Sequence, residues 1–163
     1  MSKIDWAKRL PLETIKQISL EHSLDYRLVA AICMKESSGN SFATRFEPNY
    51  KWVYKVNELT TSVGCTANTM MVMQMTSWGL MQVMGAVAYE LQFPAKQYCS
   101  QLVLPHVGIL YGCKLLTRLW SKHSTIEKVV ASYNAGNPEK YLSGEKRAKE
   151  YVDTVLNYMV QVP

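Results

Sequence analysis

The stretch "SLDYRLVAAICMKESSGN", residues 23–40, predicts a helix that carries the chain from one capping signal to the next. Ser23 or Asp25 suits the N-cap, because a short oxygen-bearing side chain can accept a hydrogen bond from the first free backbone amides. Gly39 suits the stop, since glycine adopts the left-handed conformation that ends many helices. The run between these signals is largely apolar, so we expect this helix to pack into a core.

A carboxylate interrupts the apolar side of this helix. Val29, Ile32 and Cys33 mark the side expected to face the core, and at 100° per residue Glu36 falls within the same stripe. A partly desolvated glutamate has a raised pKa and stays protonated more readily, as a general acid requires. The plainer alternative is a helix-end glutamate paired with a lysine or arginine.

Helical periodicity recurs in most of the remaining chain, so the fold class is predicted to be mainly α. The further expected helices are "LPLETIKQISLEHS" (10–23), "PHVGILYGCKLLTRLWSKH" (105–123), "STIEKVVASYNAGNP" (124–138) and "GEKRAKEYVDTVLNYMVQ" (144–161). Alternating strand patterns are scarce. Only residues 57–69, "NELTTSVGCTANT", are expected to hold one small β-hairpin.

Length and composition predict one globular domain spanning residues 1–163. The chain is 48% hydrophobic, which excludes a disordered protein. It has no run of 18 apolar residues, so we expect no membrane insertion. Residues 1–17 carry charges throughout and resemble no signal peptide, so we expect synthesis in the cytoplasm. The net charge of +5 suits an anionic partner, either nucleic acid or an acidic cell surface.

Cysteine and histidine spacing predicts neither disulfides nor a metal site. No CxxC pair occurs, and the histidines are scattered. We therefore expect free thiols in the core, and no metal or other cofactor. The residues concerned are Cys33, Cys65, Cys99, Cys113, His22, His106 and His123.

Polar residues recur where apolar stretches meet a glycine. Gln82 and Gly79 lie in "SWGLMQVMG" (77–85), and Tyr133 and Asn134 lie in "SYNAG". Singly, Gln82 reads as a buried structural amide and Asn134 as a helix-end residue. Together with Glu36 they would supply an acid, amide donors and an aromatic ring for sugar stacking along one cleft.

Four segments resemble, in order, the motifs of the soluble lytic transglycosylases, which have a goose-type lysozyme-like domain. The segments are "KESSGN" (35–40), "SWGLMQ" (77–82), "ASYNAG" (131–136) and "EYVDTV" (150–155). A fifth, "TRFEPNYKW" (44–52), resembles versions of this domain in bacteriophages and prophages, including those of the endolysin type. The resemblance implies a lysozyme-like fold and peptidoglycan as the substrate.

The resemblance also implies roles for individual residues. Glu36 would be the catalytic acid and base, supported by Ser37, and the other implied residues would bind substrate. Where the family often has a serine nine residues after the acid, this chain has Arg45, so Ser77 would take that role or the N-acetyl group would be held differently. The implied substrate-binding residues are Ser37, Ser77, Gly79, Met81, Gln82, Tyr133, Asn134 and Tyr151.

The implied reaction is cleavage of the MurNAc–GlcNAc β-1,4 bond with formation of a 1,6-anhydro sugar. A hydrolytic lysozyme is the alternative, and it would need a second carboxylate roughly 5 to 9.5 Å from the first. Glu47 and Glu58 are the candidates in the connecting stretch. A non-catalytic glycan- or DNA-binding module is a further alternative. It has little support, because the only basic cluster is "EKRAKE" (145–150).

The expected partner is the glycan strand of peptidoglycan, bound by a monomer without nucleic acid. Without a signal peptide, the protein would reach the cell wall by holin-type release or on a virion. Residues 45–75 are expected to form a mobile flank that contacts the glycan, or else to pack their aromatic side chains onto the core. These side chains are Phe46, Tyr50, Trp52 and Tyr54.

Overall fold

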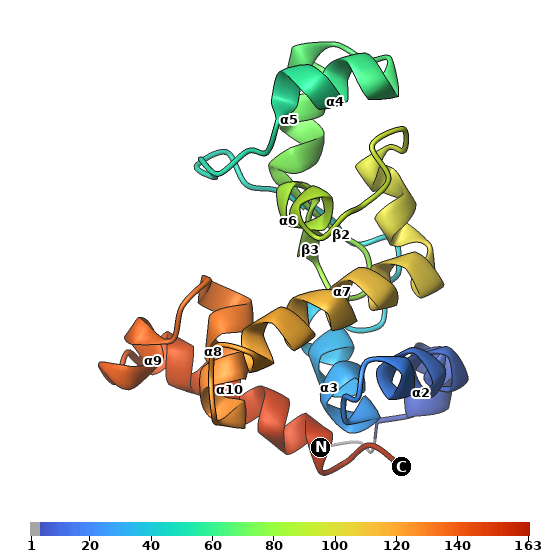
Figure 1. The fold of residues 1–163 in the computed structure, drawn as a ribbon. Coiled ribbons are helices and arrows are strands. Elements are labelled where there is room, and N and C mark those ends of the chain that lie inside the picture. The colour runs from blue at the N-terminus through green and yellow to red at the C-terminus, as the bar shows by residue number, and fades with distance from the viewer. Residues whose placement is uncertain (1–3) are drawn as a thin grey trace. The chain divides into compact units, whose positions relative to one another are not determined.

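Helices dominate the computed structural model, which describes residues 4–163 (Figure 1). The described chain contains ten α-helices, one short 3-10 helix and one three-stranded sheet. The predicted fold class, mainly α, is confirmed. The chain divides into two units, each described by itself: unit 1 (Met1–Lys35 and Cys113–Pro163) and unit 2 (Glu36–Gly112).

Unit 1 is entirely helical in its described part. Its elements are α1 (Trp6–Arg9), α2 (Leu12–Glu21), most of α3 (Tyr26–Ser37), the second half of α7 (Pro105–Trp120), α8 (Ile126–Ala135), α9 (Glu139–Leu142) and α10 (Lys146–Met159). Helices α8 and α10 pack side by side (Figure 1).

The start of α3 follows the predicted capping chemistry. Asp25 is the cap, because its Oδ1 accepts a hydrogen bond from the backbone N–H of Arg27 at 2.9 Å. The burial of the helix differs from the prediction of one apolar stripe. All seven residues from 28 to 34 are buried, so the middle of α3 is surrounded on every side. Such a helix needs no polar face there.

The ends of α8 also match their sequence signals. The Thr125 side chain accepts a hydrogen bond from the backbone N–H of Lys128, and Gly136 ends the helix in the left-handed conformation with φ 79°. Val129 and Val130 are fully buried. Helix α10 likewise buries one side, consisting of Ala148, Tyr151, Val152 and Val155.

Unit 2 contains the sheet, with strand order β1-β2-β3 and both pairings antiparallel. The strands are β1 (Thr44–Phe46), β2 (Thr76–Trp78) and β3 (Val83–Met84). Arg45 pairs with Ser77 in the register of β1 and β2, and Trp78 pairs with Val83 in that of β2 and β3. Residues 77–85, the apolar stretch that contains Gln82, therefore form a hairpin that is followed directly by a helix.

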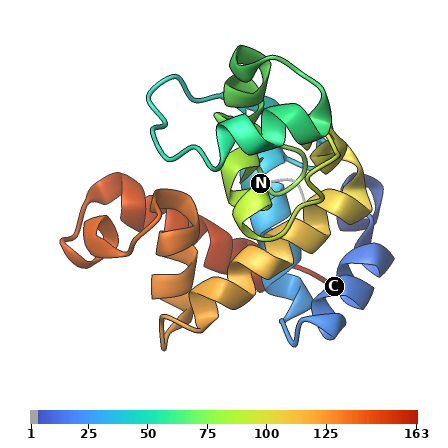
Figure 2. The same ribbon diagram turned by 45° about the horizontal axis from the view of Figure 1, so that its top comes forward.

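The small hairpin expected at residues 57–69 is wrong in its position. That stretch forms α4 (Val56–Val63) and the start of α5 (Ala67–Gln74), which pack together (Figure 2). Gly64 ends α4 at φ 75°, and Thr66 then caps α5 by accepting a hydrogen bond from the N–H of Thr69. Both signals belong to a helix–helix connection.

The rest of unit 2 is closed by α6 (Gly85–Glu90), the 3-10 helix η1 (Cys99–Val103) and the first half of α7. Two glycines on α7 permit close packing. A Cβ on Gly108 would lie 2.5 Å from the backbone oxygen of Leu102, and one on Gly112 would lie 2.1 Å from the sulfur of Met81. Gly108 thus admits a backbone, whereas Gly112 admits a side chain.

All four cysteines are free, as predicted, and only Cys65 is not buried. Among residues 4–163, no helix combines the length and apolar character needed to cross a membrane.

Candidate active site

Glu36 is the second-to-last residue of α3 and is half-buried. It follows the fully packed segment 28–34, so its backbone is fixed by a helix whose other turns lie in the core. A carboxyl at such a helix end is carried by a rigid backbone and is still partly exposed. A general acid needs both, because it must be held in place and still reach a leaving group.

The chain turns sharply after Glu36. Ser38 and Gly39 both have positive φ, 52° and 84°. The Ser37 hydroxyl accepts a hydrogen bond from the Gly39 N–H at 3.3 Å, and the Ser37 carbonyl accepts one from the Asn40 N–H at 3.0 Å. Ser37, predicted to support the acid, therefore helps to end the helix beside it.

Gln82 braces the sheet of unit 2. Its Nε2 donates to the backbone carbonyls of Ala43 and Gly79, each at 2.9 Å. Its Oε1 lies 3.0 Å from the Ser77 hydroxyl, which also lies 3.3 Å from the Arg45 carbonyl. The amide thus joins the β2–β3 turn to Ala43, the residue directly before β1. This network explains a polar side chain within an apolar stretch, because every polar atom of the half-buried amide has a partner.

Gly79 and Met81 shape the same turn from inside. Gly79 has φ 72°, and a Cβ there would lie 2.2 Å from the carbonyl oxygen of Leu102. Met81 has no exposed surface and lies against Gly112. Ser77 is also buried, with 2% of its surface exposed. Any effect of Met81 or Ser77 on a ligand would therefore pass through the shape of the wall that they support.

The two candidates for a second carboxylate are both held in ion pairs. Glu47 pairs with Arg45, and its backbone N–H donates to the Met75 carbonyl at 2.8 Å. Glu58 lies on α4 and pairs with Lys55 at 3.2 Å, with 70% of its side chain exposed. The ion pair with Glu58 raises the pKa of Lys55.

The predicted site residues of unit 1 lie on α8 and α10. Tyr133 is half-buried and Asn134 is exposed, both in the last turn of α8. Tyr151 is 8% exposed on α10, and the Nζ of Lys35 lies 5.6 Å from the centroid of its ring. Since Lys35 directly precedes Glu36, this cation–π contact ties α10 to the residue beside the predicted acid.

Two residues with evident positioning roles were not singled out from the sequence. Gln74 is fully buried and bonds the backbone of Tyr54. It is a polar residue within the apolar run "MMVMQM", the same signal that marked Gln82. Lys35 gave no such signal, because a lysine at a helix end is common and its partner Tyr151 is distant in the sequence.

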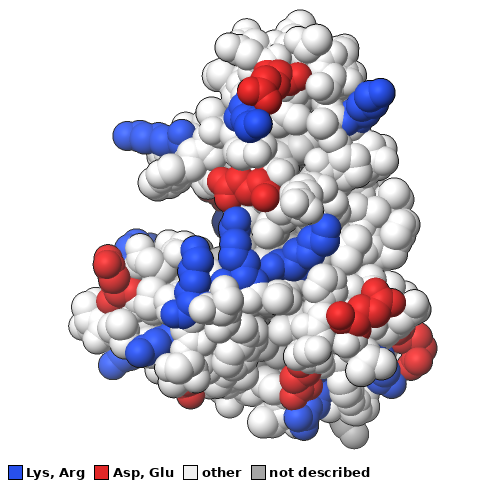
Figure 3. All heavy atoms as spheres, in the orientation of Figure 1, with Lys and Arg blue, Asp and Glu red and all other residues white. Residues whose placement is uncertain are grey.

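The surface charge is mixed. Acidic side chains lie among the basic ones on the face shown in Figure 3. Within residues 4–163, histidine, cysteine and acidic side chains form no group of three that could hold a metal ion. The buried thiols are poor nucleophiles, because burial raises the pKa of both Cys99 and Cys113 to about 12.

Comparison with known proteins gives the family. A search of curated proteins found no match to the chain. The family model of the transglycosylase SLT domain matches residues 13–153, which include Glu36 and all the other predicted site residues. The chain therefore belongs to the transglycosylase SLT domain family, whose lysozyme-like enzymes degrade the peptidoglycan of bacterial cell walls.

Proposed function

We propose that the protein is a lytic transglycosylase that cleaves the MurNAc–GlcNAc β-1,4 bond without adding water. The protonated carboxyl of Glu36 gives its proton to the glycosidic oxygen as the C1–O bond breaks and positive charge develops at the muramyl ring. The resulting carboxylate then takes the proton of the C6 hydroxyl of the same muramyl residue. The C6 oxygen forms a bond to C1, which gives the 1,6-anhydro end and restores the acid.

The observation that carries this proposal is the small number of other carboxylates in unit 2, the unit to which Glu36 belongs. Unit 2 contains no aspartate, and its only glutamates are Glu36, Glu47, Glu58 and Glu90. Glu47 is occupied by Arg45, and Glu58 is paired with Lys55 on an exposed helix. A carboxylate whose oxygens already bind a cation is poorly placed to hold a water or attack a sugar carbon. Glu90 is exposed at the last position of α6. Among the glutamates of unit 2 we therefore assign Glu36 the roles of both acid and base.

In this proposal the other predicted site residues contribute to binding of the glycan. Gln82 and Gly79 fix the β2–β3 turn against β1, so that this wall of unit 2 keeps its shape when glycan binds. Tyr133 and Asn134 would contact the sugar from the end of α8, and Tyr151 would hydrogen-bond near the acid. We further infer that the two units act together as one monomeric catalytic domain, since the family match covers most of each.

The test of Glu36 compares matched glutamate-to-glutamine variants. Glu36→Gln keeps the size of the side chain and removes its acid, so it is expected to lose nearly all clearing of chloroform-treated Gram-negative cells. Circular dichroism should match the wild type. Glu47→Gln and Glu58→Gln are the controls, and each should keep most of the activity. Glu36→Gln activity within tenfold of wild type would refute the assignment of the acid.

We also propose a bacteriophage setting, as a lysis enzyme or a virion-borne enzyme of the endolysin type. The support is the likeness of "TRFEPNYKW" to phage and prophage versions of the domain. Expression in a Gram-negative host with and without a phage holin tests the lysis role: lysis that requires the holin supports it. Lysis without the holin would contradict holin-type release.

A further inference from the structure

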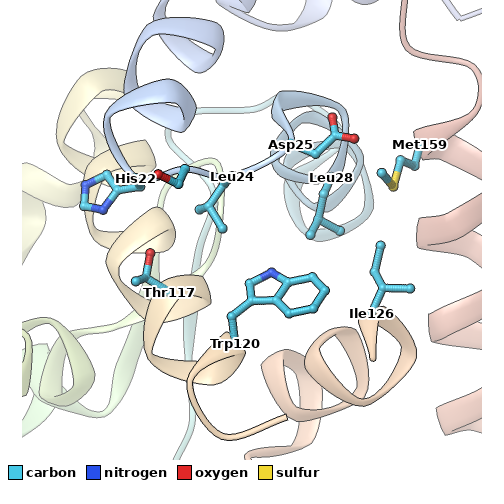
Figure 4. A pocket seen from close by; sticks show the side chains of 9 residues that line it. His22, Leu24, Asp25, Leu28, Thr117, Trp120, Ile126 and Met159 are labelled. Carbon is cyan, nitrogen blue, oxygen red and sulfur yellow. The ribbon is translucent and has the colours of Figure 1, made fainter. Parts of the chain in front are cut away.

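Unit 1 contains a cavity of about 470 Å³ that the proposed reaction does not use. It is formed by the segment before α3, the start of α3 itself, the end of α7, the first residue of α8 and the last residue of α10 (Figure 4). Its volume falls within the range of about 300 to 1,000 Å³ that is usual for small-molecule sites.

The cavity lies at the opposite helix ends from the matched motifs. Helix α3 contributes Leu28 to the cavity and carries Glu36 eight residues later. Helix α10 contributes Met159 and carries Tyr151 eight residues earlier. At 1.5 Å per residue, each separation along the helix is about 12 Å. The cavity therefore lies apart from Glu36 and from Tyr151.

The walls suit a flat, amphipathic group. Figure 4 shows the indole of Trp120 facing the side chains of Leu24 and Leu28 across the cavity. Trp120 is 37% exposed, so its ring is accessible although it belongs to the end of a packed helix. Ile126 and Met159 lie at one end of the cavity, where the Asp25 side chain also lies near Leu28 and Met159 (Figure 4).

The rim of the cavity adds polar side chains, and the carboxylate there, that of Asp25, is paired with a cation. Thr117 and His22 lie together at the end away from Ile126 (Figure 4). The Thr117 hydroxyl donates to the Cys113 carbonyl at 3.0 Å and can still accept. Asp25 is ion-paired with Arg27 at 2.6 Å, and this partner lowers the pKa of the Asp25 carboxyl. The carboxylate charge at the rim is thus compensated, which favours an uncharged ligand.

We propose that this cavity binds an N-acetylhexosamine unit of a glycan strand, as an accessory site separate from the catalytic one. The C–H face of the sugar would stack on Trp120, its acetamido methyl would lie against Ile126, and its hydroxyls would meet Thr117 and His22. The inference rests on the proposed function only in taking peptidoglycan as the substrate. A second contact with the same polymer would raise the effective concentration of cleavable bonds.

The direct test follows the indole N–H signals of the four tryptophans by NMR. The probe is the trisaccharide of N-acetylglucosamine, added to the Glu36→Gln protein so that no turnover occurs. The Trp120 signal is identified by its loss in a Trp120→Leu variant. Saturable movement of this signal is the expected result. An unmoved Trp120 signal, while signals from other parts of the protein respond, would overturn the proposal.

Variants give a second readout through co-sedimentation with purified cell walls. Trp120→Leu is expected to weaken binding roughly tenfold. Thr117→Gln, an exposed helical position whose longer side chain would obstruct the cavity, should weaken it even if the Trp120 variant folds poorly. Leu142→Ala is the control, because Leu142 is an exposed apolar residue of unit 1 outside the cavity. Binding unchanged in both cavity variants would contradict the proposal.

The outcomes separate this site from the catalytic proposal. If Glu36→Gln abolishes cleavage and the Trp120 signal does not move, the proposed function stands and the accessory site falls. If Glu36→Gln remains active, the catalytic assignment falls whatever Trp120 does. A Trp120 signal that responds to free indole but not to the trisaccharide would assign the cavity to an apolar group and overturn the sugar assignment.

Discussion

The side-chain amide of Gln74 binds the backbone of Tyr54 through two hydrogen bonds. The Nε2 of Gln74 donates to the Tyr54 carbonyl at 2.7 Å, and its Oε1 accepts from the Tyr54 N–H at 2.5 Å. Gln74 has no exposed surface. Because the Glu47 N–H is bonded to the Met75 carbonyl, both ends of the segment 47–55 are fastened to the end of α5.

Gln74→Leu should therefore destabilise unit 2 and release one end of this segment. The substitution keeps an apolar side chain of similar size but leaves the Tyr54 N–H and carbonyl without partners, at a cost of about 1–3 kcal/mol. Denaturant unfolding measures the loss, and hydrogen exchange at the Tyr54 amide locates it. Gln17→Leu is the control, since the Gln17 amide makes an exposed bond to Glu21. Unchanged protection of the Tyr54 amide would show that the pair does not fasten the segment.

Two glycines with nearly equal φ allow the cost of a left-handed backbone conformation to be distinguished from the cost of a steric clash. Gly64 has φ 75°, and a Cβ added there would meet no atom within 4 Å, whereas at Gly79, with φ 72°, it would lie 2.2 Å from the Leu102 oxygen. Gly64→Ala should cost about 1–2 kcal/mol of unfolding free energy, the usual penalty of the left-handed region. Gly79→Ala should cost clearly more and distort the turn that Gln82 braces. Denaturant unfolding compares the two, and equal losses would contradict the close approach at Gly79.

The buried thiols should make the protein less stable in alkali. A raised pKa means that the folded state keeps its proton while the unfolded state, with a thiol pKa of 9.0, has lost it. Stability is therefore full below pH 9 and declines as the pH rises toward about 12. The slope is at most about 1.4 kcal/mol per pH unit for each thiol.

Cys113→Ala tests this dependence through the slope, which is independent of any packing loss at neutral pH. Unfolding free energies between pH 9 and pH 11 should fall less steeply in this variant than in the wild type. Cys65→Ala, at a thiol that is not buried, is the comparison. Identical slopes in Cys113→Ala and wild type would mean that the Cys113 thiol is not protected by burial.

The sequence predicts that residues 45–75 contact the glycan, and within them we expect segment 47–55 to do so through its aromatic side chains. Trp52 is 71% exposed, and its ring meets that of Tyr50 edge-on with centroids 5.5 Å apart. Such a pair offers a face for sugar stacking. Chitooligosaccharide binding should slow amide exchange in this segment, and Trp52→Leu should weaken the effect. Binding that leaves every amide of the segment unaffected would refute the contact.

The sequence predicted the helical elements well where local chemistry decides them. Asp25, Thr125 and Gly136 lie at the helix ends that their side chains or backbone preferences indicate. The same reasoning misplaced the hairpin, because glycine serves both a hairpin turn and a helix end. At Gly64 the packing of α4 against α5 decides between a hairpin turn and a helix end. This packing cannot be read from the local sequence.

The candidate site, too, could be predicted from the sequence only in part. Glu36, Gln82 and Tyr133 were detectable as polar residues in apolar surroundings. Their hydrogen-bond partners could not be predicted, because these partners are distant in the sequence. Gln82, for example, donates to the Ala43 carbonyl, 39 residues away. The burial of Ser77 and Met81 was likewise beyond local pattern, since it arises from η1 and α7 closing over the hairpin.

Glu36 is proposed to act without a second carboxylate, and the mass of the released muropeptides is the most direct test of this role. A C6 hydroxyl held beside C1 can outcompete water, since well-oriented intramolecular groups reach effective molarities of about 10⁵ M or more. Purified cell walls are digested, treated with borohydride and analysed by mass spectrometry. We expect products one water lighter than their hydrolysed counterparts and resistant to reduction. Mainly reducible products would contradict the claim and identify a hydrolytic lysozyme.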